Sequence, residues 1–283
     1  MSAASPASAA PPASAASPAS AAPPASAAPP AAAAPPALRT SALRSCALVF
    51  WRDLRAYFRT PSGYLIWAIS LLIDALLFNA VAIGEGRRLS TDVLQIYLFN
   101  AAFVVEAAAV VLSMRLLAEE RATGAQLLLF TSPLNEASIV IGRFLAAFTL
   151  LAVITLSSLY LPMLIFVHGK VSFGHIAAGY LGMLLVAASV LSIGMFVSAL
   201  SPRPFVAVLG TAALVGSMEL CYFVGQITQG STGSFVASLA PVWQHYQSFR
   251  RGLLDLGDLA FFLTLTYLGL LASMRVLAGA RRR

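Results

Sequence analysis

Six long apolar runs constrain this chain more than any other feature of its sequence. An α-helix needs about 20 mostly apolar residues to cross the hydrocarbon core of a bilayer. Six runs reach that length, at residues 63–83, 94–114, 144–167, 176–200, 205–227 and 259–277. Because the backbone polar groups of a spanning segment must be hydrogen-bonded within the protein, such runs predict helices. We therefore expect an all-α membrane protein with six transmembrane helices.

The overall composition excludes an ordinary soluble enzyme. The chain is 59% hydrophobic and only 10% charged, whereas a soluble domain carries about 25% charged residues. The net charge is +7, but the basic residues lie between apolar runs rather than in one patch. That distribution is typical of a protein oriented in a membrane, and it argues against a nucleic-acid partner.

The distribution of basic residues also predicts the orientation. With both termini inside, thirteen arginines fall in the inner segments: Arg39, Arg44, Arg52, Arg55, Arg59, Arg115, Arg121, Arg143, Arg203, Arg275 and Arg281–Arg283. Only five basic residues fall outside: Arg87, Arg88, Lys170, Arg250 and Arg251. The positive-inside rule therefore places both termini in the cytoplasm. The outer residues 228–258 are moderately apolar, and we expect interfacial or re-entrant helices there.

The N-terminal region differs in kind from the rest. After Met1, residues 2–37 are only Ala, Ser and Pro, and ten of the sixteen prolines lie there. Proline excludes a continuous helix, so we expect residues 1–38 to be a disordered tail and 39–283 to be the transmembrane domain. A spacer or docking arm is one interpretation of the tail, but an extension without a specific role is the favoured one.

An amphipathic helix is predicted between the tail and the first span. Arg52, Arg55 and Arg59 share one helical face, and Ala47, Trp51, Leu54 and Phe58 share another. A helix of this kind lies at a membrane surface with its arginines toward the lipid headgroups. The sequence Thr60-Pro61-Ser62-Gly63 then ends it.

The motifs of known catalytic sites are missing from the sequence. The chain has one lysine, Lys170, and it does not lie in a phosphate-binding loop. His168, His175 and His245 are too scattered to predict a metal site. We therefore expect neither catalytic residues nor a metal or cofactor.

Three acids lie within predicted spans: Asp74, Glu106 and Glu219. A carboxylate in hydrocarbon costs at least ~2.5–3.5 kcal/mol, so each should face the helix bundle, water or a partner. Two interpretations remain equally open at this point. The acids either line a polar translocation path or hold neighbouring helices together.

The segment between the second and third spans carries a distinctive pattern. Glu119-Glu120-Arg121 followed by Gly124 is typical of a short helix with a C-terminal glycine, and an apolar run follows at 127–130. Thr131-Ser132-Pro133 breaks the chain before a helix that leads into the third span. A charged helix with an apolar run could bind a groove in another protein, whereas a plain solvated loop would not need the apolar run.

These residues resemble the signature of ABC-2 type transporter permeases. The similarity is greatest to the gliding-motility and nitrous-oxide-reductase-maturation branch. It extends in order from about Leu43 to Arg275, and it includes residues 50–61, residues 239–258 and Gly142-Arg143. Some positions depart from the branch pattern: Ala125 stands where it has Thr, Leu127 where it has Glu, and Arg143 where it usually has Lys.

The resemblance implies the membrane subunit of an exporter in the bacterial cytoplasmic membrane. Two such permeases, identical or paralogous, would pair, and a separate ABC ATPase would bind the ATP. The residues that the resemblance assigns to ATPase coupling are Glu119, Glu120, Arg121, Gly124, Leu128, Thr131, Ser132 and Pro133.

Two other classes compete with this interpretation. A secondary transporter or channel could use the three intramembrane acids as a proton or cation relay, but it would show inverted repeats or broken spans. The sequence shows neither. A membrane anchor of a motility complex, without transport, is the third class.

Overall fold

Every regular element of the described residues is an α-helix. The computed structural model describes residues 42–83, 90–118, 136–168, 171–228 and 231–281, and there is no strand within these ranges. Residues 39–283 form one compact unit. The predicted tail at 1–38 lies outside the described residues. The helices are α1 (Ala42–Arg59), α2 (Pro61–Ile83), α3 (Ser90–Leu116), α6 (Glu136–Ser157), α7 (Tyr160–His168), α8 (Phe173–Leu200), α9 (Pro204–Ile227), α10 (Ser231–Ser238), α11 (Pro241–Arg250) and α12 (Leu256–Arg281).

Six helical segments are long and apolar enough to cross a membrane, as the sequence predicted. They are Pro61–Ala80, Ser90–Leu116, Ala137–Ile165, Phe173–Leu200, Pro204–Ile227 and Leu256–Gly279. The third begins seven residues before the expected start at residue 144. The sequence prediction begins the span after Arg143, because a charged residue interrupts the apolar run there. In the structure the Arg143 side chain is only 3% exposed and lies within the helix, so its charge does not mark the start of the span. The chain is thus a multi-pass, all-helical membrane protein.

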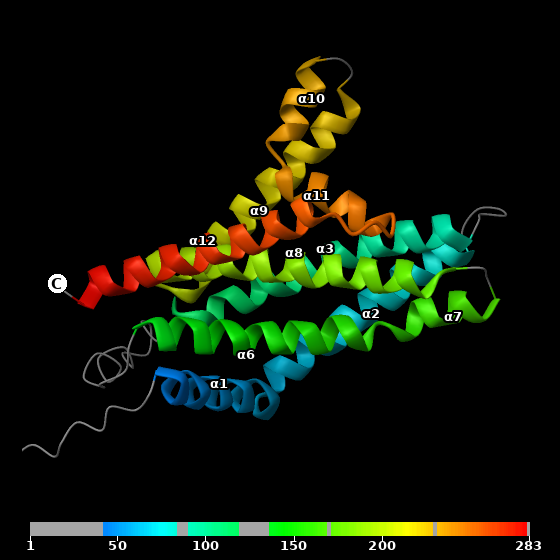
Figure 1. The fold of residues 1–283 in the computed structure, drawn as a ribbon. Helices are drawn as coiled ribbons and strands as arrows, with labels where there is room; N and C mark the ends of the chain where they lie inside the picture. Colours follow the sequence, from blue (N-terminus) through cyan, green and yellow to red (C-terminus); the bar gives the residue numbers. More distant parts are fainter. Residues whose placement is uncertain (1–41, 84–89, 119–135, 169–170, 229–230, 282–283) are drawn as a thin grey trace, which may run out of the picture. The chain divides into compact units, whose positions relative to one another are not determined.

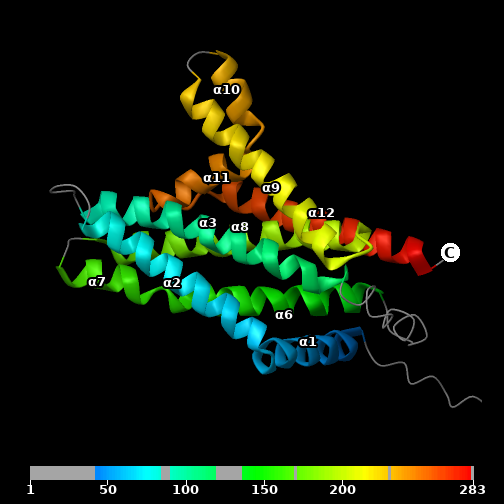
Figure 2. The ribbon, with the colours of Figure 1, turned by 180° about the vertical axis from the view of Figure 1, so that it is seen from behind.

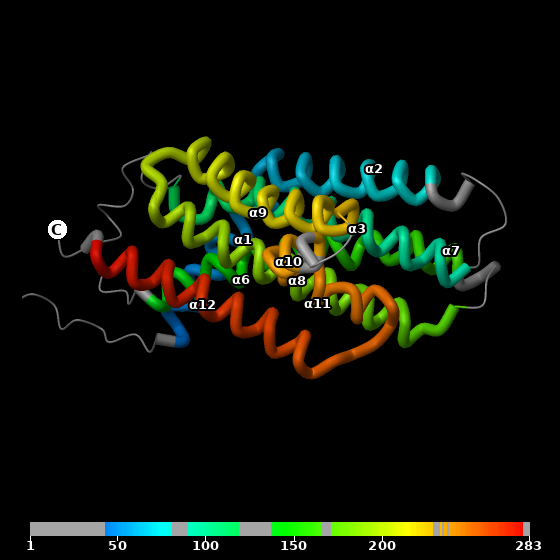
Figure 3. The backbone as a smooth tube through the Cα atoms, turned by 90° about the horizontal axis from the view of Figure 1, so that it is seen from above, coloured from blue at the N-terminus to red at the C-terminus, as the bar shows by residue number. Residues whose placement is uncertain are grey.

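The spans form an inner and an outer group. Helices α3 and α8 lie at the centre, with α2 and α9 on one side and α12 on the other (Figure 3). Helix α6 packs below α3 and α8, and α1 runs along its first half (Figures 1 and 2). In the inner spans α3, α6 and α8, 61–72% of the most apolar 18-residue stretch is buried inside the protein. In α2, α9 and α12 the buried share of the corresponding stretch is only 11–22%. The outer three therefore present most of their surface to lipid or to a partner.

Small residues let the central helices approach closely. A Cβ at Gly194 of α8 would lie 2.5 Å from the Cβ of Ser113 in α3. A Cβ at Gly269 of α12 would lie 2.6 Å from the hydroxyl oxygen of Ser192 in α8. Between membrane helices, such contacts replace the hydrophobic driving force that lipid does not supply.

The third span is broken, contrary to the expectation of uninterrupted spans. Helix α6 ends at Ser157 and α7 begins at Tyr160. Pro162 has no N–H with which to bond the Ser158 carbonyl, which instead accepts a hydrogen bond from Leu161 N at 3.0 Å. The Ser158 hydroxyl also donates to the Thr155 carbonyl at 2.8 Å, competing with the backbone ladder. Proline at this position therefore accounts for the break.

The segment between α9 and α12 contains two helices, α10 and α11, and the second belongs to the protein core. Helix α11 packs on α8 and α3, and Val242, Trp243, Tyr246 and Phe249 are buried. The Tyr246 hydroxyl donates to the Leu98 carbonyl at 2.9 Å. Burial raises the pKa of this hydroxyl well above its ordinary value, so it stays neutral and acts as a donor. In α10, by contrast, Phe235 is exposed.

Candidate functional site

The predicted coupling residues lie outside the described residues. These are Glu119, Glu120, Arg121, Gly124, Leu128, Thr131, Ser132 and Pro133. The structure does describe where this segment leaves the bundle, at Ala118, and where it returns, at Glu136. We call the contacts that hold these two ends the cytoplasmic base, after the side of the membrane that the positive-inside rule predicts for them, and we define it by Asp53, Leu116, Leu117, Ala118, Arg143 and Ser198.

Arg143 is the centre of the cytoplasmic base. Its side chain reaches from α6 to the last residue of α3, where Nη1 donates to the Leu116 carbonyl at 2.7 Å. Its Nε lies 3.6 Å from Oδ2 of Asp53 in α1. A buried guanidinium is tolerated only when it is paired with opposite charge and hydrogen-bonded. Arg143 therefore ties α1, α3 and α6 together next to both ends of the coupling segment.

Ser198 of α8 holds the same end of α3 from another side. The amides of Leu117 and Ala118 both donate to its hydroxyl oxygen, at 3.1 and 3.0 Å. These are the last described residues before the coupling segment. One side chain thus satisfies two amides beyond the end of the regular helix, and it fixes the position from which the segment starts.

Helix α1 is held against α6 at short range. A Cβ at Gly142 would lie 2.9 Å from the Cys46 carbonyl oxygen and from the Val49 Cβ, so only glycine lets the two helices approach this closely. Burial raises the pKa of the Cys46 thiol, which favours an unreactive, packed side chain. The face of α1 that packs on the bundle is Ser45, Val49 and Tyr57.

The other faces of α1 agree with the amphipathic pattern. Arg52, Arg55 and Arg59 are exposed, and Trp51 is exposed on the predicted apolar face. Arg52 also donates to Asp53 Oδ1 at 2.8 Å, so this carboxylate lies between two arginines, Arg52 and Arg143. Contact of this helix with a membrane surface stays a prediction.

The corner between α1 and α2 is linked to α3 by a second arginine. Arg115 donates from Nη1 to the Ser62 hydroxyl, and its guanidinium carbon lies 5.9 Å from the centroid of the Tyr57 ring. The sequence predicted the chain break at Thr60-Pro61, and α1 and α2 meet there. It did not predict that Arg115 would bind the corner.

The structure divides the three intramembrane acids between two places. Glu106 of α3 and Glu219 of α9 are close enough for their side chains to interact electrostatically. Glu106 is 2% exposed, and its Oε2 has no hydrogen-bond partner among the described residues. Asp74 of α2 is 1% exposed, and its Oδ1 likewise lacks a partner within the described ranges.

Asp74 lies beside the broken span. It is close enough to Tyr97 and Tyr180 to interact with both electrostatically. The Tyr180 hydroxyl is 3.1 Å from the Ser158 hydroxyl at the break and 3.4 Å from the Tyr97 hydroxyl. Sequence reasoning missed this cluster, although Pro162, four residues after Ser158, was a visible signal for the break.

Tyr246 is close enough to both places to interact electrostatically with Glu106 and with Tyr180. Its hydroxyl donates to the Leu98 carbonyl, so the relation between the two places is electrostatic rather than a chain of hydrogen bonds. No three His, Cys, Asp or Glu side chains of the described part of the chain are grouped to hold a metal ion.

The comparison with protein families identifies the class of protein that this fold and base define. Residues 15–248 match the ABC-2 family transporter protein. This match covers most of the chain, so the protein belongs to that family and is the membrane component of an ABC transporter. Membership implies an ABC ATPase partner and, as is usual in the family, a dimeric arrangement. No curated protein sequence matches the chain.

Proposed function

We propose that the protein is the permease subunit of an ABC exporter in the bacterial cytoplasmic membrane, with both termini in the cytoplasm. A separate ATPase subunit binds the ATP, and a second permease, identical or paralogous, completes the translocation path. The residues that contact the ATPase are Glu119–Pro133. Resemblance to the gliding-motility and nitrous-oxide-reductase-maturation branch supports the finer assignment.

The observation that carries this proposal is the cytoplasmic base. A coupling segment has to transmit a push from the ATPase to the spans, so its ends need firm attachment. Ser198 and Arg143 hold the exit of the segment, and Arg143 also reaches Asp53 in α1. A displacement of the segment would therefore move α1 and the cytoplasmic ends of α3 and α6 as one body.

Co-purification with an ABC ATPase partner, which we expect to be encoded by a neighbouring gene, tests the proposal. Glu120→Arg places a cation where a docking partner would offer positive charge, which replaces attraction by repulsion at the contact. Gly124→Val introduces a β-branched side chain at the expected helix end, where glycine adopts the left-handed conformation. Both variants should insert into the membrane and lose the ATPase.

A matched control is Arg251→Glu, a charge reversal at an exposed position on the opposite side of the membrane. It should retain the ATPase at the wild-type level. If Glu120→Arg and Gly124→Val each bind the ATPase as tightly as this control does, the docking assignment is wrong.

A second candidate function is a proton or cation relay. The break in the third span beside Asp74 favours it, since broken helices at membrane depth are a mark of ion-coupled transporters. Purified wild-type chain in liposomes without an ATPase would then conduct protons, and Asp74→Asn would abolish the flux. The exporter proposal expects no flux from either protein under these conditions.

A further inference from the structure

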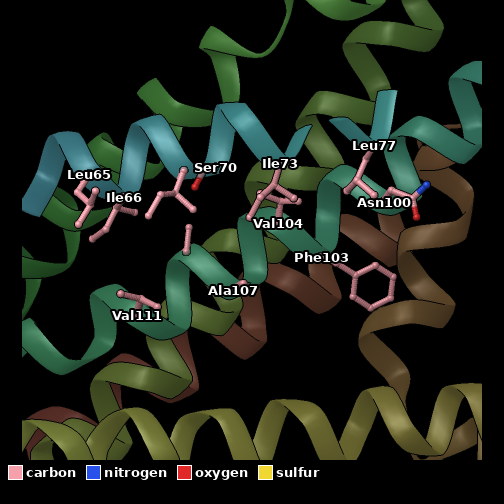
Figure 4. Close-up of a pocket in the computed structure, with 12 residues that line it drawn as sticks. Leu65, Ile66, Ser70, Ile73, Leu77, Asn100, Phe103, Val104, Ala107 and Val111 are labelled. Atoms are coloured by element: carbon pink, nitrogen blue, oxygen red, sulfur yellow. The ribbon is translucent and has the colours of Figure 1, made fainter. Parts of the chain in front are cut away.

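An apolar groove runs between α2 and α3 on the outside of the bundle. Its volume is about 570 Å³, and only two of its twelve lining residues, Ser70 and Asn100, are polar. Figure 4 shows side chains of α2, including Leu65 and Ile73, facing those of α3, including Ala107 and Val111, across the groove. Both helices are predicted spans, so the groove lies at the depth of the hydrocarbon.

The length of the groove suits one extended acyl chain. On α2 its lining extends from Leu65 to Leu77, and the twelve steps between these residues span about 18 Å of helix. One leaflet contributes about 15 Å of the hydrocarbon core, so a chain that enters from the Ser62 end would reach past the middle of the Pro61–Ala80 span. A single extended acyl chain would therefore fill the groove from end to end.

One end of the groove carries positive charge. Val104, Ala108 and Val111 of α3 line it, and Arg115 continues their stripe one turn further. On α2 the corresponding position is Ser62, whose hydroxyl accepts a hydrogen bond from Arg115. Arg59 lies exposed at the end of α1, next to the same corner. A ligand with an apolar tail and one anionic end is complementary to this arrangement.

We propose that the groove binds one anionic phospholipid from the leaflet on the Arg115 side, with an acyl chain between α2 and α3 and the phosphate at Arg115. Charge at one end only favours an amphiphile over a second copy of the chain, whose exposed spans are apolar along their length. The proposal does not depend on the direction of transport or on which side of the membrane the arginine faces.

Native mass spectrometry of the full-length protein tests this site. The protein is released from nanodiscs containing equal amounts of dioleoyl phosphatidylglycerol and dioleoyl phosphatidylcholine, which differ only in the headgroup. We expect one retained lipid per chain, with phosphatidylglycerol preferred about fivefold, the factor expected for one basic residue near an anionic surface. Ala107→Trp fills the groove and should remove the retained lipid.

Ala68→Trp is the matched control, because Ala68 is exposed on α2 but does not line the groove. It should retain lipid as the wild type does. Arg115→Gln should keep a bound lipid but lose the headgroup preference, and Arg115→Lys should keep both.

The proposal is wrong if the wild type retains no lipid, or if Ala107→Trp retains as much lipid as Ala68→Trp. It is also wrong if Ala107→Trp changes the proportion of dimer without losing lipid, since the occupant is then a second copy. Unchanged preference in Arg115→Gln would overturn the headgroup assignment.

Discussion

The cytoplasmic base and the intramembrane acids are two buried polar regions that differ in the charges around them. In the base, the Arg143 guanidinium reaches a carbonyl and a carboxylate, and one serine accepts two amides. Among the acids, the neighbour of Glu106 is another acid and the neighbours of Asp74 are two tyrosines, and one oxygen of each lacks a hydrogen-bond partner within the described residues. Opposite charges tie helices together, whereas a buried acid without a cation beside it costs free energy. We therefore expect the base to be mechanical, while the acids either line a polar path or hold neighbouring helices together.

Arg143→Met should have the largest effect on stability. It leaves the Leu116 carbonyl without its charged donor and leaves Asp53 with Arg52 alone of these two arginines, and loss of a buried charge-assisted hydrogen bond together with part of an ion pair should cost about 3 kcal/mol. Thermal unfolding of the protein in detergent measures the loss. Arg52→Met is the control, because Arg52 is exposed although it contacts the same Asp53. Equal losses in the two variants would mean that burial of Arg143 does not matter.

Ser198→Ala should have the next largest effect. It leaves the amides of Leu117 and Ala118 without an acceptor, at about 1–3 kcal/mol for a buried unsatisfied group. Ser217→Ala removes an exposed hydroxyl that bonds only its own helix, and it should change stability by about 0.5 kcal/mol or less. A Ser198→Ala protein as stable as this control would show that the two amides find other acceptors.

Substitution of the acids should have a small effect, in contrast to the base. Glu106→Gln keeps a polar group toward Glu219, and Asp74→Asn keeps the size and polarity of a side chain whose Oδ1 lacks a partner within the described residues. Each variant should unfold within about 1 kcal/mol of the wild type, the net value of one hydrogen bond. A loss of the size expected for Arg143→Met would make the acids structural and would remove the contrast between the two regions.

Deletion of residues 1–38 should have the smallest effect. An uncharged Ala/Ser/Pro tail has little apolar surface to bury against the cost of ordering it. Membrane insertion, unfolding temperature and ATPase binding should all match those of the full chain. Failure of the truncated protein to insert or to assemble would contradict this expectation.

The sequence predicts the elements better than it predicts their contacts. Six spans and the break at Thr60-Pro61 follow from hydropathy and proline, which act locally. The contact between Arg143 and Leu116 depends on how α3 meets α6, so hydropathy instead placed Arg143 outside the third span. The pairing of Glu106 with Glu219, 113 residues apart, is invisible for the same reason. The apolar groove likewise depends on how α2 and α3 meet.

We propose that the cytoplasmic base joins the predicted ATPase-binding segment to α1. Electron paramagnetic resonance can test it with one spin label at Leu43 on α1 and one at Leu263 on α12, both exposed, after replacement of Cys46 and Cys221. With the bound ATPase, addition of ATP and vanadate should shift the distance between the labels, and the Glu120→Arg variant should show no shift. An unchanged distance in the wild-type complex, or the same shift without the ATPase, would contradict the claim.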